Sequence, residues 1–237
     1  MAKRARLNER RLTKRQVAEL LEGGAVPRPD LDAELAEASV DVDDMRCYEL
    51  PEKRILWVFQ GPTATIRGKG DIYPLDYCLR FIRWARRVDA DARAGRGDSG
   101  SHWRYYSKLR ASLPDHVEPL IEELGHIVLG ASSRLEVSYA GLDSASSYLD
   151  AIGIDRAVVE IYDHLVAYAG EVMRIRTGGE WQIHRAHGYP YVRAPKHADI
   201  MPVNVVYIEF CGVMPANLRR EAANEVRRAR VNGFGRE

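Results

Sequence analysis

The sequence contains little cysteine, no long apolar run and almost no net charge. Its three cysteines, Cys47, Cys78 and Cys211, lie far apart and form no C-x-x-C pair. They therefore predict neither a disulfide framework nor a zinc cluster, and they fit a reducing compartment. No window approaches the roughly 20 apolar residues that cross a bilayer, and residues 1–14 lack the apolar core of a signal peptide. We expect a cytoplasmic protein that binds no membrane.

The motifs of several large enzyme classes are also missing. The sequence contains no Walker loop, no G-x-G-x-x-G fingerprint and no G-x-S-x-G nucleophile elbow, and Gly68-Lys69-Gly70 is too short to hold a phosphate. Cys211 lies in an apolar run, where a cysteine usually packs as a small core residue. The sequence therefore favours a protein that is not an enzyme, and it predicts no catalytic residue, no metal ligand and no cofactor.

Charge is distributed in blocks, although the formal net charge is only +1. Residues 1–16 carry seven bases against one acid, residues 30–52 nine acids against one base, and residues 80–110 nine bases against three acids. Such blocks either bind partner molecules or form ion pairs within the protein.

The Gly- and Ser-rich residues 94–101 are the best candidate for a linker between domains. We therefore divide the chain into a basic arm (1–16), an N-terminal α+β region (17–98) and a C-terminal helical region with a β-hairpin (99–237); the last two are alternatively one continuous domain.

The clearest periodic pattern lies in the second half of the chain. Large apolar side chains recur there at spacings of four and three, which predicts one long central helix over residues 154–177. Gly178-Gly179 ends this helix, and alternating residues from Trp181 onward pair as a short β-hairpin with Tyr191-Val192. The apolar stripe consists of Ile154, Val158, Ile161, Leu165, Tyr168, Val172 and Ile175.

The first half of the chain combines helix signals with strand-forming runs. Thr13 and Gln16 form a capping box before a helix that ends at Gly23-Gly24, and Pro74 opens another helix. The predicted fold is α+β and helix-rich, with a small antiparallel sheet in the first half and a short β-hairpin after the central helix 154–177. The sheet has strands at 45–50, 54–60 and 63–67; further helices are predicted at 31–38, 102–113, 114–130, 144–152 and 216–231, a strand at 133–139, and either a helix or a strand at 203–211.

Two charged segments supply candidate binding residues. Residues 80–110 combine arginines, which neutralise phosphates, with aromatic rings, which stack on bases when they are exposed. The acidic block 30–52 is suited to a basic protein partner, or to pairing with the same arginines inside the protein. The candidate binding residues are Arg80, Arg83, Arg87, Arg104, Trp103 and Tyr106 on the basic side and Asp41, Asp43 and Asp44 on the acidic side.

A histidine cluster supplies a third possibility. His184, His187 and His197 lie near Asp199, Glu209 and Cys211 in the sequence, and a 2-His-1-carboxylate metal site needs only three such ligands. In a strand, however, residues three apart face opposite sides of the sheet, so His184 and His187 are expected to diverge. The alternative is that these histidines occupy a polar hairpin tip.

The segment from Leu124 to about residue 195 resembles a known group of proteins. The sequence Leu-Gly-His-Ile-Val-Leu-Gly, followed by Ser138-Tyr139, precedes a helix that reads Ala-Gly-Glu-Val and a turn that reads Thr-Gly-Gly-Glu-Trp. Over about residues 120–195 this pattern is similar to small immunity-like or accessory α+β proteins of high-GC bacteria. The resemblance implies a binding role and carries no catalytic residue.

We therefore expect a non-catalytic protein–protein interaction protein with an accessory, immunity-like or assembly role, acting on another protein through charged surfaces. One alternative is a nucleic-acid-binding protein that uses residues 80–110 and the basic arm. The other is a metal-dependent enzyme that uses His184, His187 and His197. The sequence makes no prediction of the oligomeric state.

Overall fold

The structure is a computed structural model that describes residues 12–38, 45–61, 69–130, 135–212 and 215–233. The chain forms two compact units, Met1–Ala90 and Asp91–Glu237, each with its own apolar core. The division lies inside helix α4 (Leu75–Arg93), upstream of the linker that the sequence suggests at 94–101. Of the predicted basic arm, residues 1–11 lie outside the described residues, and residues 14–16 belong to helix α1 (Lys14–Glu22).

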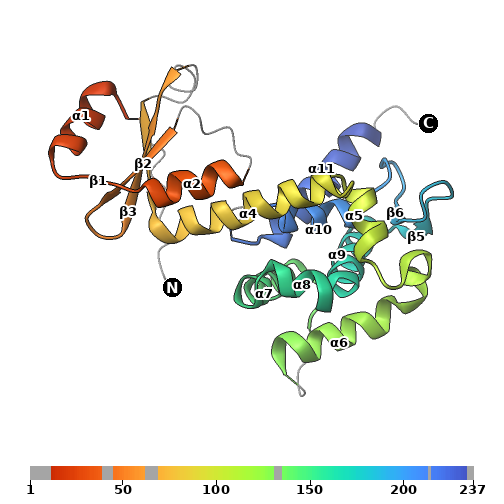
Figure 1. Ribbon diagram of the computed structural model, residues 1–237. Coiled ribbons are helices and arrows are strands. Elements are labelled where there is room, and N and C mark those ends of the chain that lie inside the picture. The colour runs from red at the N-terminus through yellow and green to blue at the C-terminus, as the bar shows by residue number, and fades with distance from the viewer. Residues whose placement is uncertain (1–11, 39–44, 62–68, 131–134, 213–214, 234–237) are drawn as a thin grey trace. The chain divides into compact units, whose positions relative to one another are not determined.

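The N-terminal unit contains an antiparallel sheet with the strand order β1-β2-β3-β4 (Figure 1). The strands predicted at 45–50 and 54–60 are confirmed, because they form β2 and β3 and pair over their whole length. The strand predicted at 63–67 lies outside the described residues, and the further partner of β3 is β4, which ends at Pro74. The strands are β1 (Val26–Pro27), β2 (Met45–Leu50), β3 (Arg54–Phe59) and β4 (Gly70–Pro74).

Two helices, α2 (Pro29–Glu37) and α4, form one core with this sheet. Trp57 of β3, Leu35 of α2 and Ile82 of α4 are buried together in this core. Trp57 reaches the core because alternate residues of a strand point to the same face of the sheet. Helix α1 begins at the predicted capping box: Thr13 Oγ1 accepts a hydrogen bond from Gln16 N, and Gln16 Oε1 accepts one from Thr13 N. The capping box therefore places the start of this helix correctly.

The C-terminal unit is built around one buried helix, α9 (Tyr162–Thr177). Helices α6, α7, α8, α10 and α11 all contact it, so its side chains are buried on every side and not only along one stripe. The neighbouring elements are α5 (Ser99–Tyr106), the 3-10 helix η1 (Arg110–His116), α6 (Val117–Leu129), α7 (Tyr139–Ile152), α8 (Ile154–Glu160), α10 (Pro202–Phe210) and α11 (Leu218–Gly233).

The predicted central helix 154–177 is divided into two helices at Ile161. The backbone there leaves the helical region, with φ −129° and ψ 16°. The first part, α8, stays at the surface, where Val159 is 61% exposed. The second part, α9, is buried on all sides as far as Met173, and its buried residues include Asp163, which lies outside the apolar stripe. Ile175, the last residue of the predicted stripe, is 53% exposed. The break therefore separates a surface helix from a core helix, whereas the apolar periodicity predicted a single continuous helix.

Further segments differ from the sequence-based expectation. The helix predicted at 102–113 ends at Tyr106, and the helix predicted from 114 begins at Val117, because residues 110–116 form the 3-10 helix η1. No strand forms over the described residues of the stretch predicted at 133–139, because the chain there enters a helix: Ser138 Oγ accepts a hydrogen bond from Gly141 N and caps α7. The ambiguous residues 203–211 form helix α10, with Pro202 in the first turn, where a missing N–H costs little. The α+β, helix-rich fold itself is confirmed.

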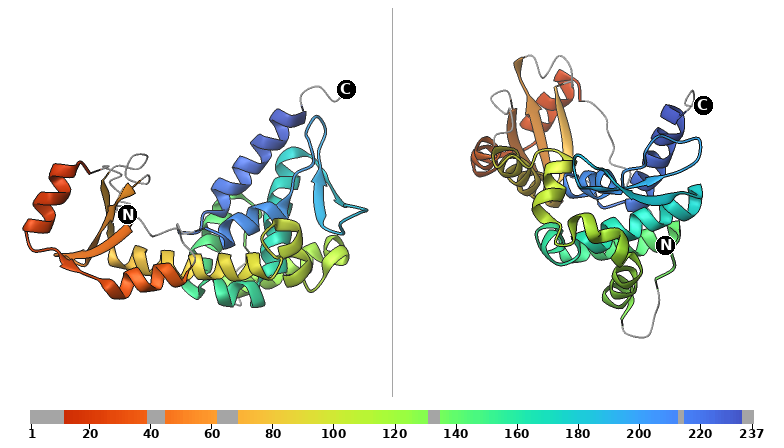
Figure 2. Two further views of the ribbon diagram at one scale, coloured as in Figure 1. Left: turned by 45° about the horizontal axis from the view of Figure 1, so that its top comes forward. Right: turned by 90° about the vertical axis from the view of Figure 1, so that its right-hand side faces the viewer.

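The predicted β-hairpin is confirmed, and it packs against α9 (Figure 2). Strand β5 (Glu180–Ile183) pairs with β6 (Pro190–Arg193), with Trp181 opposite Val192. Trp181 Nε1 donates a hydrogen bond to Glu171 Oε2 of α9 at 3.0 Å, and the indole lies against Gly170. The base of the hairpin is thus held firmly, and residues 184–189 form its tip.

Candidate functional site

The acidic block is largely engaged within the N-terminal unit where it is described. The candidate residues Asp41, Asp43 and Asp44 lie outside the described residues. Arg28 Nη2 contacts Asp30 at 2.6 Å and its Nη1 contacts Glu49 at 2.7 Å, which holds the guanidinium between two carboxylates. The other described ion pairs of the block join Arg86 to Glu34 and Glu37 and Arg54 to Glu52.

The basic segment 80–110 is divided between the two units. Arg80, Arg83 and Arg87 lie on α4 in the N-terminal unit, where Arg80 Nη2 is 3.4 Å from Asp76 Oδ2. The other three candidates lie on α5 in the C-terminal unit, and two of them are unsuited to base stacking. Trp103 is 1% exposed and belongs to the core, and Tyr106 donates its hydroxyl to Asp91 Oδ1 at 3.1 Å. The expectation that Trp103 presents an exposed ring is therefore wrong; Arg104 remains exposed.

The hairpin tip brings two of the predicted histidines together. His184 and His187 do not diverge as a strand would require, because residues 185–187 form a turn in which His184 O accepts hydrogen bonds from His187 N and Gly188 N. Their ring centroids are 4.7 Å apart. Tyr189 completes the group, with its ring 4.8 Å from that of His184 and 5.7 Å from that of His187. The polar hairpin tip is thus confirmed, but the argument from strand spacing is wrong.

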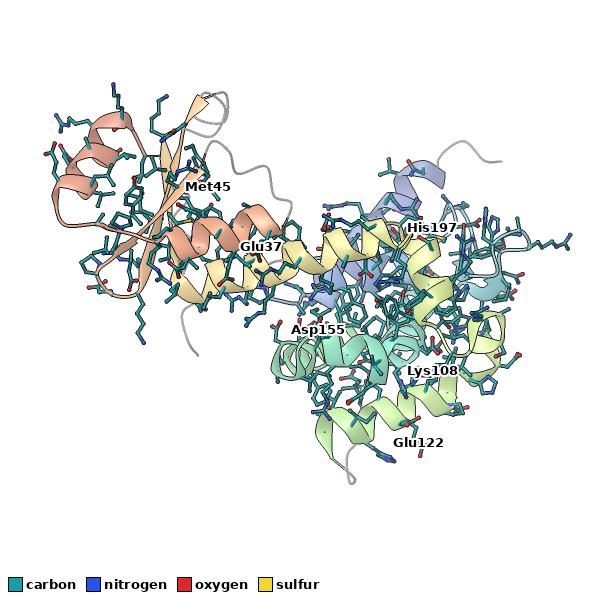
Figure 3. The ribbon with its side chains drawn as sticks, in the orientation of Figure 1. Glu37, Met45, Lys108, Glu122, Asp155 and His197 are labelled. Carbon is teal, nitrogen blue, oxygen red and sulfur yellow. The ribbon has the colours of Figure 1, made fainter. Side chains whose placement is uncertain are left out.

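These rings face a hollow of about 690 Å³, which we call the histidine pocket. His197 is not among the residues that line it; its Nδ1 lies 2.7 Å from the Pro195 carbonyl, and its backbone lies against Gly233 of α11 (Figure 3). Among the described residues, no three His, Cys, Asp or Glu side chains are arranged to hold a metal ion. The pocket is lined by Asp98, Ser99, Gly100, Arg104, His184, His187, Tyr189, Ala198, Asp199, Met201, Asn204 and Arg228.

A second pocket of about 190 Å³ lies between residues 106–109, which lead from α5 toward η1, and helices α6, α8 and α9; we call it the acidic pocket. Its centre is Asp163, which is 6% exposed. Asp163 Oδ2 accepts hydrogen bonds from the backbone N–H groups of Lys108 at 2.8 Å and Leu109 at 3.1 Å. Its Oδ1 is buried and has no hydrogen-bond partner among the described residues. The pocket is lined by Tyr106, Lys108, Leu109, Leu120, Val159, Glu160, Tyr162, Asp163 and His164.

Asp163 occupies this position because it lies in the first turn of α9. A carboxylate there is stabilised by the partial positive charge of the helix N-terminus. The two hydrogen bonds to Oδ2 also fix the backbone just before η1. A buried acceptor without a partner costs about 1–3 kcal/mol. Because Oδ1 is buried, a donor from outside the chain reaches it when the pocket walls move, and it then gains the binding energy of an unpaired acceptor.

Further acidic groups surround the pocket. His164 Nε2 lies 3.1 Å from Glu123 Oε2 of α6, and Glu160 accepts a hydrogen bond from Arg156 Nε at 2.7 Å. On α6, Glu118 and Glu122 are also exposed, but each is two residues from the pocket-lining Leu120 and so projects from roughly the opposite side of the helix (Glu122 and Lys108 are labelled in Figure 3). Helix α6 contains these acids and neither lysine nor arginine. It presents acidic side chains that the charge blocks did not predict. The excess of glutamate over lysine and arginine in residues 117–129 is the sequence signal that could have indicated them.

Comparison with known proteins adds no relative. The chain matches no protein-family model, and neither the curated proteins nor the solved structures contain a significant match to it. None of the described helices is long and apolar enough to cross a membrane. The two pockets and the acidic face of α6 are therefore the features from which a function can be inferred.

Proposed function

We propose that the chain is a non-catalytic protein–protein interaction protein with an accessory, immunity-like or assembly role, and that its acidic pocket holds a basic side chain of the partner. The observation that supports this is the buried carboxylate of Asp163, whose Oδ1 lacks a partner among the described residues. An arginine or lysine side chain matches such a pocket, because its charged head binds a carboxylate while its methylene groups contact apolar walls.

The pocket walls fit both ends of such a side chain. Leu109, Leu120 and Val159 supply apolar surface, and Asp163 and Glu160 supply carboxylate oxygens. One cation, Lys108, also lines the pocket, but it binds Asp163 through its backbone N–H and its side chain is exposed. The position inside the pocket therefore remains suited to a cation from another molecule.

The surface around the pocket supports a partner with a basic face. Glu123 and Glu160 lie beside the pocket, and Glu118 and Glu122 on the outer side of α6 add negative charge to the same helix, which steers a basic protein toward this part of the unit and raises the association rate. Inhibitors that mask basic proteins such as nucleases use charge in this way. Within this proposal the protein is bacterial and cytoplasmic; Cys47, Cys78 and Cys211 form no disulfide, which fits a reducing compartment.

Asp163→Asn is expected to weaken partner binding by about 10- to 100-fold and to leave the fold intact. The asparagine oxygen still accepts the hydrogen bonds from Lys108 N and Leu109 N, but its amide places a donor where the partner's cation needs an acceptor. The measurement is affinity capture from the cells that make the protein, followed by binding of the purified partner. A thermal melt of the variant shows whether the fold is retained.

Charge reversal tests the acidic face separately. Glu118→Lys/Glu122→Lys is expected to slow association and remove much of the salt dependence, since it inverts the field of α6. Glu19→Lys/Glu22→Lys makes the same charge change on the exposed face of α1 and serves as the control. The proposal fails if no stoichiometric partner is captured in repeated trials, or if a captured partner binds all of these variants equally well.

A further inference from the structure

We infer that the histidine pocket is a separate binding site for a small phosphorylated ligand, with the phosphate group held by side chains from four elements of the C-terminal unit. Arg104 comes from α5, His184 and His187 from the hairpin tip, Asn204 from α10 and Arg228 from α11. The hollow of about 690 Å³ lies within the size range of small-molecule sites.

One of the two acidic groups of this pocket is already engaged. Asp98 accepts hydrogen bonds from Gly100 N at 2.9 Å, Ser101 N at 2.9 Å and Ser101 Oγ at 2.6 Å, so its carboxylate caps α5. Asp199 forms an ion pair with Arg193, with 3.7 Å between Oδ1 and Nε, which offsets its charge but is too long for a hydrogen bond. The protein itself therefore occupies most of the hydrogen-bonding capacity of Asp98 and pairs the charge of Asp199.

The donors facing the pocket are less occupied than the acids. Arg104 is exposed, and within the described part of the chain its guanidinium makes no hydrogen bond or ion pair, although the charge of Asp98 lies near it. His187 is exposed at the hairpin tip, whereas His184 Nδ1 is buried and does not itself contact a ligand, although it has no hydrogen-bond partner among the described residues. Arg228 binds Glu225 and the Asp199 carbonyl through Nε and Nη2, so it is the least available of the cations. Unused donors thus outnumber unused acceptors, which favours an anionic ligand.

Several features distinguish a phosphate from a simple carboxylate as the expected group. The donors approach from separate elements and not as one planar fork, which suits a tetrahedral group with three terminal oxygens. The two imidazoles, whose ring centroids are 4.7 Å apart, add ring nitrogens that can donate hydrogen bonds.

The pocket is also preorganised. The hairpin tip is closed by hydrogen bonds from His184 N to Tyr189 O and from Gly188 N to His184 O, and the Tyr189 ring packs over Gly100 of α5. The base of the hairpin is held through Trp181 and Glu171. A ligand therefore finds the two imidazoles already in place, and little binding energy is spent in ordering them.

The test is a titration of the whole chain with inorganic phosphate, at constant pH and ionic strength, followed by the NMR signals of the histidine rings and by calorimetry. Arg104→Ala and His187→Ala, both on exposed side chains, are each expected to weaken phosphate binding by about tenfold, the effect of losing one charge-assisted hydrogen bond. Arg227→Ala removes an exposed arginine of α11 that does not line the pocket, and it is expected to bind as the wild type does.

Two results would overturn the inference: the wild-type protein shows no saturable binding at millimolar phosphate, or Arg104→Ala and His187→Ala bind phosphate as tightly as the Arg227→Ala control. A second arm uses a nucleoside monophosphate as the probe. If it competes with inorganic phosphate and loses affinity in the same variants, the phosphate belongs to a larger ligand in this pocket. None of these measurements involves a protein partner or the acidic pocket.

Discussion

Replacing Gly170 by alanine is expected to lower the free energy of unfolding of the C-terminal unit by about 3 kcal/mol or more, which is at the upper end of the cost of overpacking a core. A Cβ atom at this position of α9 would overlap the indole of Trp181 and would lie 2.8 Å from Pro202 Cγ. Neither neighbour moves easily. Trp181 is held by its hydrogen bond to Glu171 Oε2 and by strand β5, and Pro202 begins α10.

The measurement is urea unfolding followed by tryptophan fluorescence, with Gly97→Ala as the matched control. A Cβ at Gly97 meets Ala92 Cα at 3.5 Å, an ordinary contact, so this variant should unfold within about 0.5 kcal/mol of the wild type. If the overlap with the indole is the cause, Gly170→Ala costs less in a Trp181→Ala background than alone. Equal stability of the Gly170 and Gly97 variants would contradict the packing that we describe.

The free energy of unfolding is also expected to fall as the pH rises from about 5 to 8, and Glu209→Gln is expected to remove this dependence. Glu209 of α10 is 4% exposed. Its Oε2 accepts a hydrogen bond from Asn217 N at 2.8 Å, but its Oε1 is buried and has no hydrogen-bond partner among the described residues. Burial raises the pKa of this carboxyl from 4.5 to about 7, although the Asn217 N–H and the charge of Arg220 oppose the shift.

The sign follows from which state binds the proton. Between pH 4.5 and about 7 the folded protein keeps a proton on Glu209 that the unfolded chain has released, so rising pH favours the unfolded chain. The contribution is fully lost above the folded-state pKa. A pKa shift of this size corresponds to about 3 kcal/mol, at about 1.4 kcal/mol per unit. Glutamine keeps the acceptor for Asn217 N and cannot lose a proton.

The check is a series of urea unfolding curves at pH 5, 6, 7 and 8 for the wild type, Glu209→Gln and Glu122→Gln. Glu122 is exposed on α6, and its glutamine variant should follow the wild-type pH dependence. The variant at Glu209 should gain stability relative to the wild type as the pH rises. Parallel curves for all three proteins would show that Glu209 does not control this dependence.

Local sequence signals account for much of the fold. The capping box at Thr13, the strand-forming run 54–60 and the left-handed Gly178 each act within a few residues, so they can be read without the rest of the chain. β4 escaped prediction because its first and last residues are Gly70 and Pro74, which have turn preferences. Its pairing with β3, which is set by the sheet as a whole, overrides those preferences.

The sites depend on contacts between residues far apart in the sequence, which no local pattern reveals. Asp163 binds the backbone of Lys108, and the histidine pocket brings Arg104 close to the hairpin tip. The histidines themselves were visible in the sequence. Their convergence was not, because it depends on a turn at residues 185–187, where strand geometry no longer applies.

The position of the division within α4 has a consequence for separating the two units experimentally. Asp91 near the end of this helix accepts a hydrogen bond from Tyr106 and pairs with Arg96 at 2.7 Å, and Arg96 in turn covers the ring of Tyr105. A fragment that begins at Ser99 would lack Asp91 and Arg96. The Tyr106 hydroxyl would lose its acceptor Asp91, and the Tyr105 ring would lose its contact with the Arg96 guanidinium. A fragment that begins upstream of Asp91 retains this contact group, so it is the better starting point for expressing the C-terminal unit alone.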